Sequence, residues 1–197
     1  LEGSVFVAGS LVQWLRDDLG LISHAADTEP LARSVPDNGG VYLVPALSGL
    51  GAPHWRPDAR ATISGLSFAA SKAHVARAAL EAMAYATYDV LGDMRTQGGV
   101  PFDRLRVDGG ASANDWLMQF QADQLQVPVV LPVDRETTAC GAAFLAGLGI
   151  GAWTSTTDIS AQWASNVTYF PNNENLSVVD ASHAQWLNAV QRVRTTQ

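Results

Sequence analysis

The stretch Val107-Asp108-Gly109-Gly110-Ala111-Ser112-Ala113-Asn114 follows a β-prone run and opens a helical pattern over residues 114–125. Two adjacent glycines allow a left-handed turn and let a ligand approach the backbone without a Cβ in the way. The first turn of the following helix offers free N–H groups and a positive dipole end. The stretch is therefore typical of a nucleotide-binding turn. A tight strand-to-helix turn without a ligand has the same pattern, and the octapeptide alone favours that second interpretation.

Working outward from this turn, strand and helix patterns alternate along the chain. Apolar residues at three- and four-residue steps predict a long amphipathic helix from residue 71 to the glycines at 98–99. Strands at 105–107 and 127–131 then alternate with helices at 114–125 and 138–148, which predicts an α/β fold with a parallel sheet in that part. Other expected elements are a helix at 9–19, a loop at 27–40, strands at 41–45, 61–66 and 167–170, and a final helix from about 182.

The composition restricts the class of protein. Hydrophobic residues make up 47% of the 197 residues and charged residues 16%, which is usual for one folded domain. The formal charge of −7 and the scattered basic residues argue against a nucleic-acid partner. The single cysteine, Cys140, excludes a disulfide framework and is interpreted as a small apolar residue in a packed helix.

No apolar run is long enough to span a bilayer. The chain begins at Leu1, without a Met or a signal peptide, and Ser4 to Gly9 has the pattern of the middle of an ordered element. We therefore expect a fragment of a longer cytoplasmic protein.

Two further patterns are weaker. Gly9 and Gln13 are four residues apart, which places a glycine backbone and an amide side chain on one helical face, and an amide can read a ribose hydroxyl or an adenine edge. The small residues at 141–143 and 146–147 permit close packing of a helix on a sheet. Taken alone, the first pair is an ordinary surface pair and the second set is a packing feature.

Several segments resemble the glycerol kinases of the FGGY carbohydrate kinase family. Ala61-Thr62-Ile63-Ser64-Gly65-Leu66, a seven-residue gap and His74-Val75-Ala76-Arg77-Ala78-Ala79-Leu80-Glu81 fit the C-terminal signature of that family. The resemblance extends in register over about residues 1–170. It includes residues 1–6, 13–17, 39–42 and 44–50, Ala52-Pro53-His54-Trp55, Arg106-Val107-Asp108-Gly109-Gly110, Leu117-Met118-Gln119-Phe120-Gln121 and Cys140-Gly141-Ala142-Ala143.

The resemblance implies a ribonuclease H-like domain of the actin/hexokinase type, with a mixed sheet and helices on both faces. Residues 1–197 would form the C-terminal, nucleotide-binding domain, with 151–197 as its tail. Gly9, Gln13, Gly110 and Asn114 match family positions that contact the adenosine part of ADP, so the resemblance raises the glycine turn to an expected site. The implied cofactors are ATP and Mg²⁺.

The resemblance also indicates what this chain lacks. The phosphate-binding hairpin, the glycerol-binding residues, the catalytic Asp and the main metal contacts would all precede Leu1, and Asp108 belongs to the adenosine turn. We therefore expect no catalytic or metal-binding residue in this chain, and we expect only the intact protein to phosphorylate glycerol. The expected partners are the N-terminal domain of the same protein and further copies of the protein in a homo-oligomer. The alternatives are another FGGY kinase, acting on a pentulose or gluconate, and a non-catalytic nucleotide-binding module.

Overall fold

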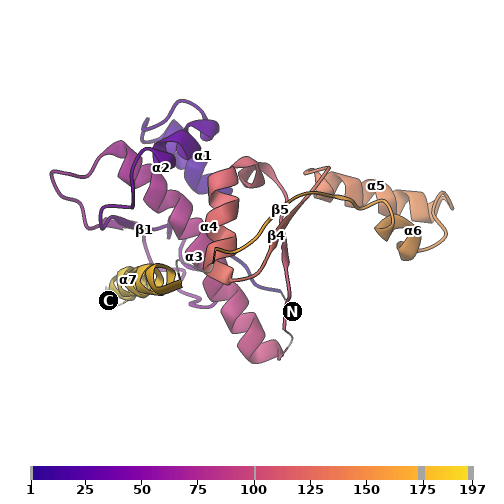
Figure 1. The fold of residues 1–197 in the computed structure, drawn as a ribbon. Coiled ribbons are helices and arrows are strands. Elements are labelled where there is room, and N and C mark those ends of the chain that lie inside the picture. Colours follow the sequence, from indigo (N-terminus) through magenta and orange to yellow (C-terminus); the bar gives the residue numbers. More distant parts are fainter. Residues whose placement is uncertain (1, 100, 173–175, 195–197) are drawn as a thin grey trace.

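The computed structural model of the chain describes residues 2–99, 101–172 and 176–194, and the other positions of the expected domain lie outside the described residues. A long central helix, α3 (Lys72–Gly98), runs through the molecule, and most other elements gather along it (Figure 1). Helices and a mixed sheet occur together, which confirms the predicted α/β class.

The ends of α3 follow from its sequence. Ser71 caps the N-terminus, where its backbone N–H donates to Nδ1 of His74 at 3.1 Å. Gly99 adopts φ 62° and ends the helix in a left-handed cap, which suits a residue without a Cβ. Most of the buried side chains in the first half of α3 are alanines, so neighbouring helices can approach its backbone closely.

Two small sheets flank this helix. Strands β1 (Tyr42–Val44) and β2 (Thr62–Ser64) pair antiparallel. Strand β3 (Leu105–Arg106) pairs parallel with β4 (Val129–Pro132), as the alternating pattern predicted, and β4 pairs antiparallel with β5 (Ser165–Tyr169). All four residues of β4 are buried, since it is the middle strand and α4 (Asp115–Leu125) packs against it.

The buried residues form two clusters. The larger one joins α1 (Gly9–Asp17), α3, α4 and the strands β1 and β4, with Leu11, Leu15 and Leu80 at its centre. The smaller one packs the side chains of Tyr85 and Val44 against α7 (Leu176–Arg194). The larger cluster is therefore the part of the core that holds α1 and α4 in fixed positions.

Three predicted boundaries are corrected by the structure. Helix α1 ends at Asp17 rather than Leu19. The stretch 27–40, predicted to be mostly loop, contains the helix α2 (Thr28–Arg33) and the last residue of the short helix η1 (Ala25–Asp27). Pro30 lies in the first turn of α2, where a missing N–H costs nothing. Helix α7 begins at Leu176 rather than near Ser182.

Helix α5 (Thr137–Gly149) differs most from the expected packing. Figure 1 shows α5 and α6 (Thr156–Ser160) at one end of the molecule, beyond the β4–β5 ribbon. Leu145 is 68% exposed, and Gly147 is buried against Trp153 rather than against a sheet. The small residues of this helix therefore do not mediate the helix–sheet packing that the sequence suggested.

Candidate nucleotide site

A cavity of about 630 Å³ opens between α1, α2, α3 and the start of α4. This volume falls within the usual range for a small-molecule site, about 300–1,000 Å³. All four residues predicted to contact adenosine line it: Gly9, Gln13, Gly110 and Asn114. The structure thus brings together residues that are about one hundred positions apart in the sequence.

The glycine turn forms one wall of the cavity. Gly109 follows β3 and adopts φ 76°, a left-handed conformation that favours glycine. Residues Gly110–Ala113 form the short helix η2, and Asn114 then caps α4. A Cβ added at Gly110 would meet no atom within 4 Å. The packing of the chain itself therefore does not require glycine at position 110, and the space in front of this backbone is open.

Helix α1 forms the opposite wall. Gly9 is its first residue, and a Cβ added there would also meet nothing within 4 Å. Gln13 is exposed, and its carboxamide has no hydrogen-bond partner among residues 2–99, 101–172 and 176–194. An amide in this state can bind a ligand without first giving up a bond within the protein.

Asn114 is bound differently from Gln13. Its Oδ1 accepts from the backbone N–H of Leu117 at 2.9 Å, which makes it the N-cap of α4. Its Nδ2 donates to Oγ1 of Thr28 at 3.3 Å. The Asn114 side chain is therefore held in one orientation at the edge of the cavity.

The rest of the lining is mainly apolar or small. Leu80 and Met83 of α3 lie beside Val12 of α1 and Leu117 of α4, and alanines at 25, 26, 111 and 113 complete the surface. Apolar walls with a few polar groups suit a flat, partly apolar base better than a bare phosphate or an ion.

Two of the described residues that line the cavity carry a charge. Arg16 forms a bidentate pair with Asp17 and lowers the pKa of that carboxyl by hydrogen bonding. Glu29 accepts from Arg33 and, at 3.1 Å, from the backbone N–H of Asp115. Glu29 thereby ties α2 to the N-terminus of α4, across one side of the cavity.

Strand β5 holds the same end of α4. The hydroxyl of Tyr169 donates to Oδ1 of Asp115 at 2.6 Å. Burial, with this hydrogen bond to a carboxylate, raises the pKa of Tyr169 to about 12. The start of α4 is therefore fixed from α2 and from β5 before any ligand binds.

The sequence did not indicate that Thr28 and Glu29 line the cavity. Both lie in the stretch predicted to be a loop, and no motif marked them. The acidic first turn of α2 was the only available signal. Met83 was expected only on the apolar face of the long helix, and Leu80 only as part of the FGGY signature segment 74–81.

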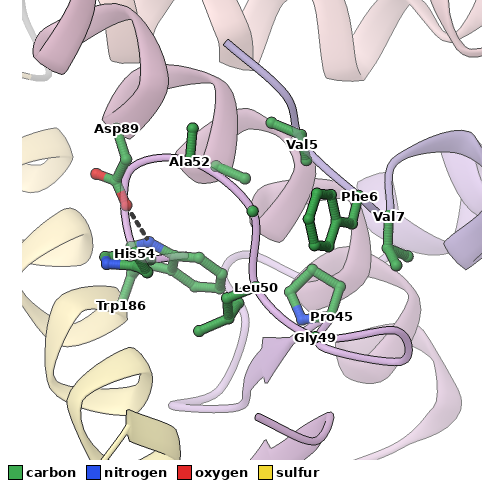
Figure 2. A pocket seen from close by; sticks show the side chains of 12 residues that line it. Val5, Phe6, Val7, Pro45, Gly49, Leu50, Ala52, His54, Asp89 and Trp186 are labelled. Atoms are coloured by element: carbon green, nitrogen blue, oxygen red, sulfur yellow. Dashed lines mark hydrogen bonds between the residues drawn. The ribbon is translucent and has the colours of Figure 1, made fainter. Parts of the chain in front are cut away.

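A second cavity is much smaller. It measures about 30 Å³ and lies between residues 5–7, the loop 49–54, α3 and α7 (Figure 2). It has room for about one water molecule and none for a nucleotide. Asp89 lies beside it and is partly buried: its Oδ1 lies 2.7 Å from Nε2 of His183, and its Oδ2 accepts from Nε1 of Trp186 at 3.0 Å.

Other chemically notable groups lie outside both cavities. Cys140 is half-buried at the start of α5, and a hydrogen bond from its Sγ to Asp134, with burial, raises the pKa of the thiol. The described residues contain no group of three or more His, Cys, Asp or Glu side chains that could hold a metal ion. Within the same residues, no helix has the length and apolarity needed to cross a membrane.

The comparisons with known proteins define the family. The model of the FGGY family of carbohydrate kinases, C-terminal domain, matches residues 1–150. The chain therefore belongs to this family, as its signature segments indicated.

Within the family, the chain is similar to glycerol kinases. It is 54% identical to glycerol kinase from Herminiimonas arsenicoxydans and 56% identical to that from Nocardia farcinica, over 198 residues in each case. Each alignment covers 98% of this chain and 39% of the relative. The chain thus spans about two fifths of the length of these relatives.

Solved structures support the same relationship. Plasmodium falciparum glycerol kinase with ADP has a TM-score of 0.84 and 31% identity, covering 98% of this chain and 38% of that one. A ligand-bound xylulose kinase from Lactobacillus acidophilus also has a TM-score of 0.84, at 22% identity, and covers 98% of this chain and 40% of that one. At this lower identity the likeness shows the shared fold alone.

Proposed function

We propose that this chain is the nucleotide-binding, C-terminal part of an ATP-dependent glycerol kinase, which converts glycerol and ATP to glycerol 3-phosphate and ADP. The observation that carries the proposal is the cavity in which Gly9, Gln13, Gly110 and Asn114 meet. The identity of more than half of the residues with glycerol kinases, and the fold likeness to one solved with ADP, support the choice of reaction.

In this proposal the adenosine part of the nucleotide occupies the cavity of about 630 Å³. The open backbone at Gly9 and Gly110 lets the ligand lie against the main chain, and Gln13 and Asn114 supply amide groups to its polar edges. The apolar side chains of Leu80 and Met83 cover the base and exclude water from it. Binding and orienting adenosine is the contribution of these residues to phosphoryl transfer.

The remaining chemistry is assigned to the part of the protein that would precede this chain. Mg²⁺ would neutralise charge on the transferred phosphoryl group, and a carboxylate would take the proton of the glycerol hydroxyl. The described residues offer neither a metal-binding cluster nor a carboxylate in the cavity free of protein partners, since Glu29 is bound by Arg33 and by the Asp115 N–H. An N-terminal domain of the same protein, a cytoplasmic location and a homo-oligomer remain part of this proposal.

The two alternatives make different predictions. Another FGGY kinase would phosphorylate a pentulose or gluconate, and the fold likeness to xylulose kinase is compatible with that reaction. A non-catalytic module would bind nucleotide without supporting turnover in any longer form. A substrate screen on the full-length protein separates these alternatives from a glycerol kinase.

The decisive experiment uses the Gln13→Ala substitution in the full-length kinase. Because Gln13 is exposed and makes no bond within the described chain, its removal leaves stability unchanged. We expect KM for ATP to rise about five- to tenfold, the loss of roughly one hydrogen bond, while KM for glycerol stays constant. The matched control is Gln185→Ala, an exposed position on α7 far from the cavity. Equal KM values for ATP in the two variants would contradict the proposed site, and the isolated chain is expected to show no turnover.

A further inference from the structure

Thr28 is a buried polar residue that is not among the four residues proposed to contact the nucleotide. It is 2% exposed, begins α2 and lines the cavity beside Asn114. Its Oγ1 donates to the backbone carbonyl of Ala25 at 2.7 Å. The same oxygen accepts from Nδ2 of Asn114 at 3.3 Å, which links residues 86 positions apart.

The direction of these bonds is determined by the number of protons available. A hydroxyl has one hydrogen, and the Thr28 hydroxyl uses it on the Ala25 carbonyl. Toward Asn114 it can therefore only accept. The backbone N–H of Leu117, on the other side, can only donate, and Oδ1 of Asn114 accepts it at 2.9 Å.

The Asn114 carboxamide is consequently held with its oxygen toward α4 and its nitrogen toward Thr28. In the reversed orientation, Oδ1 of Asn114 would face the Thr28 oxygen and Nδ2 would face the Leu117 N–H. Two acceptors would then meet at Thr28 and two donors at Leu117, and both hydrogen bonds would be lost. One N–H of Nδ2 remains without a partner among the described residues, at a residue that lines the cavity.

We propose that Thr28 is a positioning residue that fixes the Asn114 amide as a hydrogen-bond donor to the bound nucleotide. This inference rests on the proposed nucleotide site. It specifies the recognition: Asn114 donates to an acceptor on the ligand, such as a ring nitrogen or a ribose oxygen, and does not bind the exocyclic amino group of the base.

The test measures ADP binding by calorimetry with the full-length kinase and its Thr28→Val, Thr28→Ser and Asn114→Ala variants. Valine has the shape of threonine but cannot accept a hydrogen bond. We expect Thr28→Val to weaken ADP binding about fivefold, the scale of one hydrogen bond, and Thr28→Ser to restore affinity to within about twofold of wild type. In the Asn114→Ala background, Thr28→Val should cause no further loss. Additive losses would overturn the proposal.

Ligand analogues test whether Thr28 acts on the nucleotide contact or only supports the fold. If Thr28 were only structural, Thr28→Val would not change the difference in affinity between ADP and an analogue. ADP analogues that each lack one acceptor, at N1, N3, N7 or the ribose 2′ oxygen, are compared on the same variants. One analogue should bind the wild-type chain more weakly than ADP, and this difference should shrink in both Thr28→Val and Asn114→Ala. If every analogue retains its full difference in Thr28→Val, the proposal is wrong.

Two further variants distinguish the loss of a ligand contact from a loss of folding. Asn114→Asp keeps a side-chain oxygen for the Leu117 N–H, so α4 stays capped, but it offers oxygen where the amide offers N–H and should lose ADP affinity. Thr87 lies on α3 and is not among the residues that line the cavity, and its hydroxyl donates to the Met83 carbonyl at 2.9 Å. Thr87→Val removes this comparable hydrogen bond and should bind ADP as the wild type does. Wild-type affinity in Asn114→Asp would overturn the proposal, and failure of the full-length wild-type kinase to bind ADP would overturn the proposed site as well.

Discussion

At the scale of single residues, the two glycines of the turn have different reasons to be glycine. Gly109 needs a left-handed backbone, which costs other residues about 1–2 kcal/mol. Gly110 is absent from the positive-φ positions and has open space before it, so neither its backbone nor its neighbours in the protein require glycine. The sequence marked both glycines as one motif, and only the backbone geometry separates the position that needs glycine for its conformation from the one proposed to contact the ligand.

This difference predicts the outcome of substitutions at Gly110. Because a Cβ at position 110 meets no protein atom, Gly110→Val should leave the free energy of unfolding nearly unchanged while its side chain occupies the space of the ligand. We expect ADP affinity, measured by calorimetry, to fall at least about tenfold, an effect of ~1.4 kcal/mol. Gly92→Ala, on α3 away from the cavity, serves as the control. Unchanged ADP affinity in Gly110→Val would place the nucleotide elsewhere.

At the scale of elements, periodic apolar spacing predicted the long helix α3 and the β3–α4–β4 unit well. It failed where an element is short or has no apolar stripe. Helix α2 has six residues and includes Pro30, and the first half of α7 exposes residues such as Val178. The missed helix α2 supplies Thr28 and Glu29 to the cavity, so this error also hid part of the site.

Helix α7 is attached to α3 through Asp89, and this contact leads to a prediction. Asp89→Ala removes the acceptor of both His183 and Trp186 and leaves the buried indole N–H without a partner. We expect a loss of about 2–3 kcal/mol in the free energy of unfolding, measured with urea. Asp93→Ala, which loses only an exposed contact to Gln97 on the same helix, should cost less than about 0.5 kcal/mol. Equal losses would show that Asp89 does not anchor α7.

At the scale of the whole molecule, the resemblance to FGGY kinases named four residues expected to contact adenosine, and all four line one cavity in the fold. What the sequence could not give is the tertiary arrangement around them, because hydrogen bonds such as Thr28–Asn114 join residues 86 positions apart. Nor did it show that α5 leaves its apolar residue Leu145 exposed, since composition alone does not reveal a missing neighbour.

The junction of the N-terminal segment, α3 and α7 makes the stability of the whole molecule depend on pH. His54 lies there beside the small cavity (Figure 2), and burial lowers its pKa, although Asp89 opposes the shift. The unfolded chain, with a histidine pKa of about 6.5, therefore binds more protons than the folded one as the solution is acidified below neutrality. This part of the stability is complete above pH ~6.5 and is lost as pH falls through the lowered pKa.

His54→Gln should remove this dependence. We expect urea unfolding of the wild-type chain to show a larger loss of free energy between pH 7 and pH 5 than the variant shows, because the variant lacks the imidazole whose pKa burial lowers. His24→Gln, at an exposed position, is the control for replacing a surface imidazole by an amide. Parallel pH curves for the wild-type chain and His54→Gln would mean that the imidazole is protonated as easily in the folded state as in the unfolded state, and that the junction tolerates its charge.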